Sequence, residues 1–366
     1  MTKTELFLSR LNESPYLGER VTLHTKDIKD PYVDSTEFIY ITAQLQEREA
    51  EGYYGDSSID LARKRPGNID KNNPATRWMY EHLPGFAEWH SLVPQAAALE
   101  PLYNPMITTL ANGEEFTNEM RLWMSNIYDA IGIRSRAEVM KSVAVEEVLR
   151  TPDIKRQWVS LGCGAAQPVM TALEDIRDKG AIVPDVMLVD IQKEALSLAV
   201  QGAERAGFAE NVTPRRMNIL NPKGIAAERE PGAGFYSNML RMGGKLPAKS
   251  YDMVDAVGIL EYLKPGDWKY AYGHVIKTQK GMAGARSFLH NAFELVKPGG
   301  QLIVGNMRDT HPQLGFTLNT IQWPHIQPRS VEDMVALIRE AGLEGEIDVY
   351  CPDDNVYAIY VIRKDL

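Results

Sequence analysis

Short apolar runs alternate with amphipathic segments of helical spacing through the second half of the chain. The runs carry no polar face, which is typical of strands buried on both sides of a parallel sheet. We expect strands at 159–161, 186–190, 212–217, 251–257, 301–306, 346–350 and 356–363, with helices at 169–179, 193–207, 288–296 and 331–341. This order predicts an α/β fold in which helices cover a mainly parallel sheet.

The first 150 residues have a different pattern. Amphipathic segments of helical spacing recur at 5–11, 38–49, 76–81, 92–102, 118–131 and 137–149. Ser135, with Glu138 three residues later, resembles a capping box and predicts that the last of these helices begins directly after Ser135. No flexible linker precedes residue 151, so we expect two units packed permanently together. They are a helical cover, residues 1–150, and a catalytic domain, residues 151–366.

A glycine-containing turn joins the first predicted strand to its helix. The segment reads Val159-Ser160-Leu161-Gly162-Cys163-Gly164, and Pro168 opens the helix at a position where its missing N–H costs nothing. Asp190, followed by Ile191, ends the next apolar strand. Glycines let the backbone approach a ligand closely, and a carboxylate at the second strand end can bind a ribose diol. The pattern favours a nucleotide site, although a turn that only packs the helix on the strand stays an alternative.

This turn departs from the dinucleotide fingerprint, because Gln167 stands at the third glycine position. The Gly-Cys-Gly turn with Asp190 resembles motif I of class I S-adenosylmethionine (SAM) methyltransferases. The resemblance implies SAM as the cofactor, held by Gly162, Cys163, Gly164, Asp190 and Ile191. Many members of that family carry an acid where this chain has Ser160, so the methionine amine is expected to find its partners elsewhere.

Two later segments agree with the resemblance. Tyr251 to Leu263 resembles the strand and loop that close the methionine side of the SAM pocket, which implies that Ala256 and Gly258 offer backbone carbonyls to the amine. The turn Lys297-Pro298-Gly299-Gly300 before an apolar strand is a further signature. The resemblance also implies that Asn218, with Ile219, faces the adenine, although a strand-end cap explains Asn218 equally well. The implied fold is a seven-stranded Rossmann-like sheet whose last strand is antiparallel.

The segments after the fourth and fifth of these strands are expected to hold the acceptor. The candidate catalytic residues are Glu261 and Tyr262 in the first segment and Asn306, Arg308 and His311 in the second. Carboxyl ends of neighbouring strands meet at one edge of an open sheet, so these residues are expected to lie together. Glu261 as a cap or pairing residue on the next helix and His311 as a loop hydrogen-bonding residue are the alternatives. Both segments loosely resemble bacterial methyltransferases of small acids, including those that form hydroxy fatty acid methyl esters.

Composition narrows the choice of partners. The chain has 366 residues, a net charge of −9 and 44% hydrophobic residues, as in an ordinary globular protein. An acidic chain does not offer the basic face that nucleic acid needs, and no long apolar run suggests a membrane span. Two cysteines exclude a disulfide framework and a cysteine-rich zinc site, and we expect no metal and a cytoplasmic location.

The leading hypothesis is a SAM-dependent methyltransferase that acts on oxygen or nitrogen of a small molecule. An enzyme of the same fold that uses the aminocarboxypropyl group of SAM, by transfer or ring closure, is the first alternative. A SAM-binding regulatory protein without activity is the second. The sequence predicts neither the acceptor nor the oligomeric state.

Overall fold

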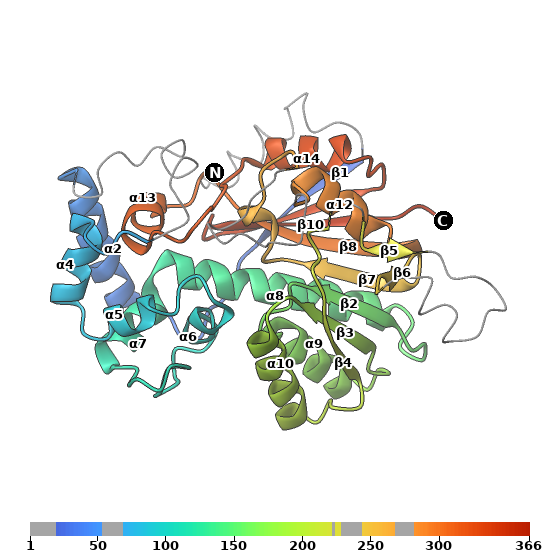
Figure 1. Ribbon diagram of the computed structural model, residues 1–366, viewed down its shortest axis with the longest axis horizontal. Coiled ribbons are helices and arrows are strands. Elements are labelled where there is room, and N and C mark those ends of the chain that lie inside the picture. Colours follow the sequence, from blue (N-terminus) through green and yellow to red (C-terminus); the bar gives the residue numbers. More distant parts are fainter. Residues whose placement is uncertain (1–19, 53–68, 222–223, 228–243, 268–281) are drawn as a thin grey trace.

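An eight-stranded sheet forms the centre of the molecule (Figure 1). The computed structural model describes residues 20–52, 69–221, 224–227, 244–267 and 282–366. The strands lie in the order β1-β9-β10-β8-β7-β2-β3-β4, and β10 is antiparallel to both neighbours while the other pairs are parallel. Their bounds are β1 Val21–Lys26, β2 Gln157–Leu161, β3 Asp185–Asp190, β4 Val212–Arg216, β7 Tyr251–Ala256, β8 Val296–Met307, β9 Ile347–Pro352 and β10 Tyr357–Arg363. A separate short parallel pair joins β5 Ala226–Ala227 to β6 Leu246–Pro247.

Seven of these strands confirm the sheet predicted from the second half of the chain, with an antiparallel last strand. The eighth strand, β1, was not predicted, so the expected number of seven strands is corrected to eight. It pairs in parallel with β9 from Val21, opposite Ile347, to Lys26, opposite Pro352. The sheet is therefore not complete without residues 1–150, because its outer edge comes from them.

Helices cover both faces of the sheet. On one face lie α8 Tyr128–Leu149, α9 Gln167–Asp178 and α10 Lys193–Ala206, and on the other α12 Ala285–Phe293 and α14 Val331–Glu340. Successive strand residues alternate between the two cores, as Trp158 and Val159 do in β2. This burial on both faces explains the continuous apolar runs. Ser330 caps the start of α14, since its Oγ accepts a hydrogen bond from the Asp333 N–H.

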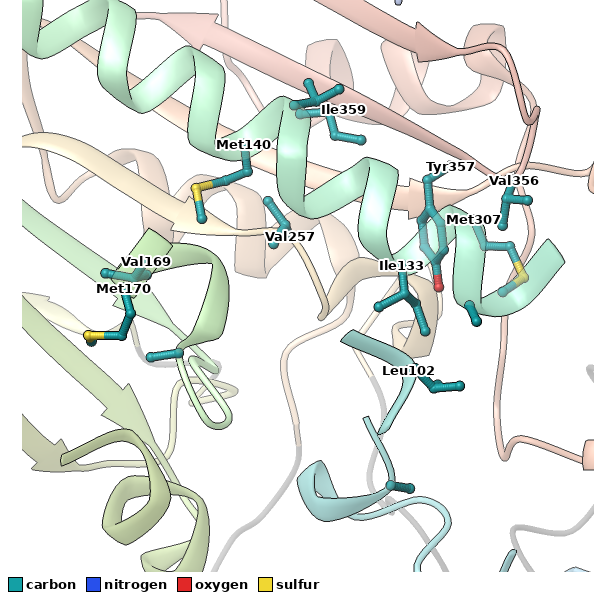
Figure 2. Packing of buried hydrophobic residues seen from close by; sticks show 14 of the residues in the cluster. Leu102, Ile133, Met140, Val169, Met170, Val257, Met307, Val356, Tyr357 and Ile359 are labelled. Carbon is teal, nitrogen blue, oxygen red and sulfur yellow. The ribbon is translucent and has the colours of Figure 1, made fainter. Parts of the chain in front are cut away.

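Helix α8 is one continuous helix of 22 residues, and the predicted start after Ser135 is wrong. Ser135 lies inside the helix, 3% exposed, and its Oγ donates hydrogen bonds to the Gly132 carbonyl and to Asp354 Oδ2. Tertiary partners satisfy this hydroxyl, so it has no capping role. Figure 2 shows α8 crossing the sheet with Ile133 and Met140 on its buried side, near Tyr357 and Val257.

The remaining N-terminal helices gather at one end of the molecule beside α13 (Figure 1). Helices α2 and α4 confirm the segments expected at 38–49 and 76–81. The segment 92–102 is not one helix, since it forms turns, η1 and α6. The segment 5–11 lies outside the described residues. The bounds are α2 Ser35–Ala50, α4 Pro74–His82, α5 Phe86–His90, η1 Ala96–Ala98, α6 Glu100–Tyr103, α7 Asn118–Asn126, η2 Leu260–Tyr262, α13 Leu314–Phe316 and the π-helical turn η3 Thr317–Ile321.

Candidate functional site

The turn after β2 has the geometry of a ligand cradle. Gly162 and Gly164 have φ angles of 65° and 54°, a left-handed conformation that glycine adopts without strain. A Cβ on Gly162 would stand 2.3 Å from Ile259 Cδ1, so the turn lies against the segment after β7. The N–H groups of Gly162 and Cys163 both donate to the Val189 carbonyl, which holds the turn on the end of β3.

Asp190 fastens this turn from the end of β3. Its Oδ2 accepts a hydrogen bond from the Gly164 N–H at 3.0 Å, and its Oδ1 accepts from the Gln192 N–H at 2.9 Å. Ile191, next to it, is 47% exposed. The carboxylate retains further lone pairs, so it can also accept from a bound diol.

Asn218 and Ile219 follow β4 on the same side of the turn. Asn218 Oδ1 accepts a hydrogen bond from the Leu220 N–H at 2.9 Å, as a strand-end cap does. Ile219 is 7% exposed, and its Cδ1 would be 3.5 Å from a Cβ on Gly162. The structure therefore brings Ile219 to the glycine turn, and a role of Asn218 at an adenine stays a prediction.

A cavity lies between the turn and α8, and we call it the glycine-turn cavity. Its walls come from the ends of β2 and β7, the start of α9, helix α8 and the segment 96–103. The lining residues are Ala96, Leu99, Glu100, Tyr103, Arg136, Met140, Ser160, Gly162, Cys163, Gly164, Ala165, Ala166, Gln167, Pro168, Val169, Asp255, Val257 and Gly258. Gly258 is at the predicted place, whereas Ala256 is the last, fully buried residue of β7 and is not part of the lining.

A second, narrow and largely apolar cavity adjoins the first, and we call it the aromatic cavity. Arg136, Gly258 and Leu99 line both cavities, so the two share one wall. The lining residues are Trp89, Leu99, Leu102, Asp129, Ile133, Arg136, Gly258, Glu261, Tyr262, Met307, Thr317, Ile321, Trp323, Ile326 and Tyr357. Figure 2 shows four of them, with Ile133 on α8 and Leu102, Met307 and Tyr357 near that helix. Glu261 and Tyr262 thus line this cavity, and their role at an acceptor stays a prediction.

An ion pair between Arg136 and Glu261 forms the polar part of this second cavity. Arg136 Nη1 donates to Glu261 Oε1 at 3.0 Å, with the side chains 3% and 1% exposed. Arg136 Nη2 donates to the Tyr103 hydroxyl at 3.3 Å, and the guanidinium lies 4.5 Å from the centre of the Tyr357 ring. Within the described part of the chain, Arg136 Nε and Glu261 Oε2 have no hydrogen-bond partner. Two buried polar atoms are therefore available to ligands.

Burial and pairing set the charge of these groups. Burial alone would lower the pKa of Arg136, but Tyr103, Tyr357 and Glu261 raise it, so the guanidinium stays charged. Burial raises the pKa of Glu261, and Arg136 opposes that rise. Burial also raises the pKa of the Cys163 thiol, with Asp190 and Asp255 adding to the effect, so the thiol in the turn is neutral.

The segments after β7 and β8 meet as expected, since the Gln327 N–H donates to the Glu261 carbonyl. Asn306, Arg308 and His311 nevertheless lie outside the lining of both cavities, which corrects the place expected for their side chains. Asn306 donates to two backbone carbonyls and accepts from Arg329 at 2.6 Å. Arg308, 1% exposed, donates to Asn355 Oδ1 at 2.9 Å. His311 lies behind the aromatic cavity, with Nε2 3.6 Å from Asp129 Oδ1. These side chains hold the segment after β8 in place, and its later residues line the cavity.

Sequence reasoning missed Arg136, Asp129 and Trp323. Arg136 and Asp129 lie within α8, where charged residues at core positions are a usable signal, because buried charges need partners. Because the helix was predicted to begin after Ser135, Arg136 was assigned to a solvated first turn, and its burial was not expected. Trp323 belongs to the long segment after β8 that the sequence did mark as functional.

Solved structures share this fold at low sequence identity. A protein described as a possible exported protein from Bordetella parapertussis is 17% identical, with a TM-score of 0.54 over 91% of this chain and 97% of that one. An O-methyltransferase family protein from Burkholderia thailandensis is 16% identical over 91% and 98% of the two chains, with a TM-score of 0.43. The S-adenosylmethionine-dependent methyltransferase SibL is 16% identical over 79% and 72%, with a TM-score of 0.44. No family model matches the sequence, and no curated protein does so either.

Two searches of the described residues bear on other classes of site. Within those residues, no helix is both long and apolar enough to cross a membrane. The same part of the chain contains no group of three or more His, Cys, Asp or Glu residues arranged to hold a metal ion.

Proposed function

We propose that this protein is a SAM-dependent methyltransferase that acts on an oxygen or nitrogen of a small molecule. The observation that carries the proposal is the pair of adjoining cavities. One is built on the glycine turn, the other is apolar, and Arg136 and Gly258 line both. Such a pair suits a reaction in which a cofactor and an acceptor must be held in contact and away from water.

The residues of the glycine turn fit SAM in shape and charge. Ile259 fills the space at the Gly162 Cβ position, so a glycine there lets the segment after β7 pack on the turn, and Gly162 and Gly164 both line the cavity with backbone that a ligand can contact. Asp190, held to the turn by the Gly164 N–H, can accept hydrogen bonds from a ribose, and the exposed Ile191 offers an apolar surface to a base. The cavity beyond the turn has a cationic group, Arg136, and a carboxyl group, Asp255, which suit the two charges of an amino acid.

Bound SAM supplies an electrophilic methyl group, and the chain has to orient the acceptor and take up its proton. Glu261 Oε2 is a buried acceptor atom without a partner, so it can accept a hydrogen bond from an acceptor O–H or N–H. When the new bond to carbon forms, that proton passes to Glu261, whose raised pKa favours proton uptake. Arg136 holds Glu261 in position through Oε1.

This arrangement supports an alcohol, phenol or amine as the acceptor. A carboxylate has no proton to give and would meet Glu261 as a like charge. Arg308, a cationic candidate that could hold a carboxylate, does not line either cavity. The aromatic walls from Trp89, Trp323 and Tyr357 suit a flat apolar acceptor.

The test uses SAM labelled in the methyl group or in the carboxyl group, incubated with pools of small phenols, alcohols and amines. Methyl label in the product supports the proposal. Carboxyl label in the product would assign the aminocarboxypropyl chemistry instead, and SAM binding without any product from a broad pool would favour a regulatory protein.

Glu261→Gln should lower turnover at least tenfold while SAM affinity stays near wild type, because a lost base costs about 10²–10⁴-fold in rate. Asp252→Asn is the matched control. Asp252 is also a buried carboxylate, but it lies at the start of β7, pairs with Arg156 at 2.8 Å and is outside both cavities. Equal turnover in wild type and Glu261→Gln would remove Glu261 from the chemistry.

A further inference from the structure

The carboxyl group of Asp255, on β7, lies beside Ser160, although β2 itself has no acidic residue at that position. Strands β2 and β7 pair in parallel with Ser160 opposite Asp255. Ser160 Oγ donates to Asp255 Oδ1 at 2.9 Å, and Trp158 Nε1 donates to Asp255 Oδ2 at 2.7 Å. Asp255 is 3% exposed, and both Ser160 and Asp255 line the glycine-turn cavity.

The position of this carboxyl group has a parallel in the sequence pattern. Ser160 stands two residues before Gly162, where the motif that the turn resembles often has an acid. Residues paired across two strands point to the same face of the sheet, so Asp255 delivers its carboxyl group beside the place that such an acid would occupy. The carboxyl group that β2 lacks at Ser160 is therefore present on the neighbouring strand, β7, as Asp255.

We infer that Asp255 binds the ammonium group at the methionine end of SAM, in place of an acid at Ser160. The inference rests on the proposed function. Each Asp255 oxygen already accepts one hydrogen bond and retains a lone pair for a ligand. The amino acid end of SAM carries one positive and one negative charge, and Asp255 with Arg136 across the cavity matches both.

The energetics favour a cationic ligand at this carboxyl group. Burial raises the pKa of Asp255 to about 7, and the hydrogen bonds from Trp158 and Ser160 only partly oppose that rise. A buried carboxylate without a cation is costly, and an ammonium group in contact offsets the cost. Glu100 is the competing carboxylate, because it lines the same cavity from α6.

The experiment measures binding of two ligands by calorimetry to the full chain. S-adenosylhomocysteine carries the ammonium group, and 5′-methylthioadenosine lacks the whole aminocarboxypropyl end. Asp255→Asn should weaken binding of S-adenosylhomocysteine by about 10- to 100-fold, the range expected for a charged hydrogen bond. Binding of 5′-methylthioadenosine should change by less than about threefold.

Asparagine keeps both contacts of the native side chain. Its oxygen can accept from Trp158 Nε1, and its amide can donate to Ser160 Oγ, so the fold is expected to persist. A double exchange, Ser160→Asp with Asp255→Ser, moves the carboxyl group back to β2. It should retain the preference for S-adenosylhomocysteine, and it decides the question if Asp255→Asn does not fold.

Two control variants separate the possibilities. Asp190→Asn should weaken both ligands alike, since both carry the ribose. Glu100→Gln should leave the ratio of the two affinities unchanged, and a collapse of that ratio in Glu100→Gln alone would assign the ammonium group to Glu100.

An unchanged ratio in a folded Asp255→Asn variant, or loss of the preference in the double exchange, would overturn the role of Asp255 and leave the proposed function standing. If neither ligand binds the wild-type protein, the SAM site itself is wrong, and the inference fails with it.

Discussion

Arg136 and Glu261 form a buried ion pair at 3.0 Å although 125 positions separate them in the sequence. Arg136 belongs to α8, and Glu261 belongs to η2, directly after β7. The pair therefore ties the N-terminal half of the chain to the loop edge of the sheet. It also stands at the wall between the two cavities, since Arg136 lines both.

Arg136→Met should lower the free energy of unfolding by about 3–5 kcal/mol, because it leaves the Glu261 carboxylate buried without its cation. Urea unfolding followed by circular dichroism measures the loss. Adding Glu261→Gln to Arg136→Met removes the orphaned charge, so the double variant should be more stable than Arg136→Met alone. A single variant that loses less than about 1 kcal/mol would show that water or another group already solvates Glu261.

Asp190→Asn should weaken SAM binding by about 1.5–3 kcal/mol, because the ribose loses a charged hydrogen-bond acceptor. Calorimetric titration with SAM gives the affinity. Stability should fall by only about 1 kcal/mol, since the asparagine oxygen can still accept from one of the two N–H groups that Asp190 now binds. Wild-type affinity in a folded variant would exclude Asp190 from the site.

Gly162→Ala should destabilise the protein and abolish SAM binding. A methyl group there would lie 2.3 Å from Ile259 Cδ1, and φ of 65° disfavours any residue with a Cβ. Ile259→Ala added to Gly162→Ala relieves the clash but not the backbone strain, so it should restore only part of the melting temperature. Gly180→Ala is a control for strain alone, because its φ is 76° and a Cβ there meets no atom within 4 Å.

The raised pKa of Asp255 predicts how the stability of the protein changes with pH. Its pKa is raised to about 7 in the folded protein, above its value of about 3.9 in an unfolded chain, so the folded state binds the proton more tightly. Its contribution to stability is complete below about pH 4 and is lost progressively as the pH rises to about 7, because over this range the unfolded chain is ionised while the folded carboxyl group still holds its proton. Wild type should therefore lose stability relative to Asp255→Asn between about pH 4 and pH 7, measured by denaturant midpoints. Parallel curves for the two proteins would place the carboxyl pKa in its ordinary range.

Local chemistry was enough to predict the glycine turn and the strand beside it. The turn at Gly162 and Gly164 and the strand that ends at Asp190 depend on residues close to them in the chain. The apolar runs predicted most strands of the eight-stranded sheet, because strands buried on both faces need apolar residues at every position, whereas the edge strand β4 is polar and largely exposed. Within the eight-stranded sheet, β1 was not predicted, since it is short, only partly buried and lies at the sheet edge.

The aromatic cavity depended on tertiary structure. Glu261 and Tyr262 were predicted from their place after β7, but the partner Arg136 lies far away in sequence and within one continuous helix. Asn306 is the next-to-last residue of β8 and Arg308 follows this strand, yet hydrogen bonds with Arg329 and Asn355 direct their side chains away from the cavity. Strand order fixes which loops meet, whereas the hydrogen bonds and packing of distant elements decide which side chains reach a cavity. The pattern of apolar residues therefore determined the sheet, and local residues determined the glycine turn. Only long-range pairing determined the aromatic cavity beside them.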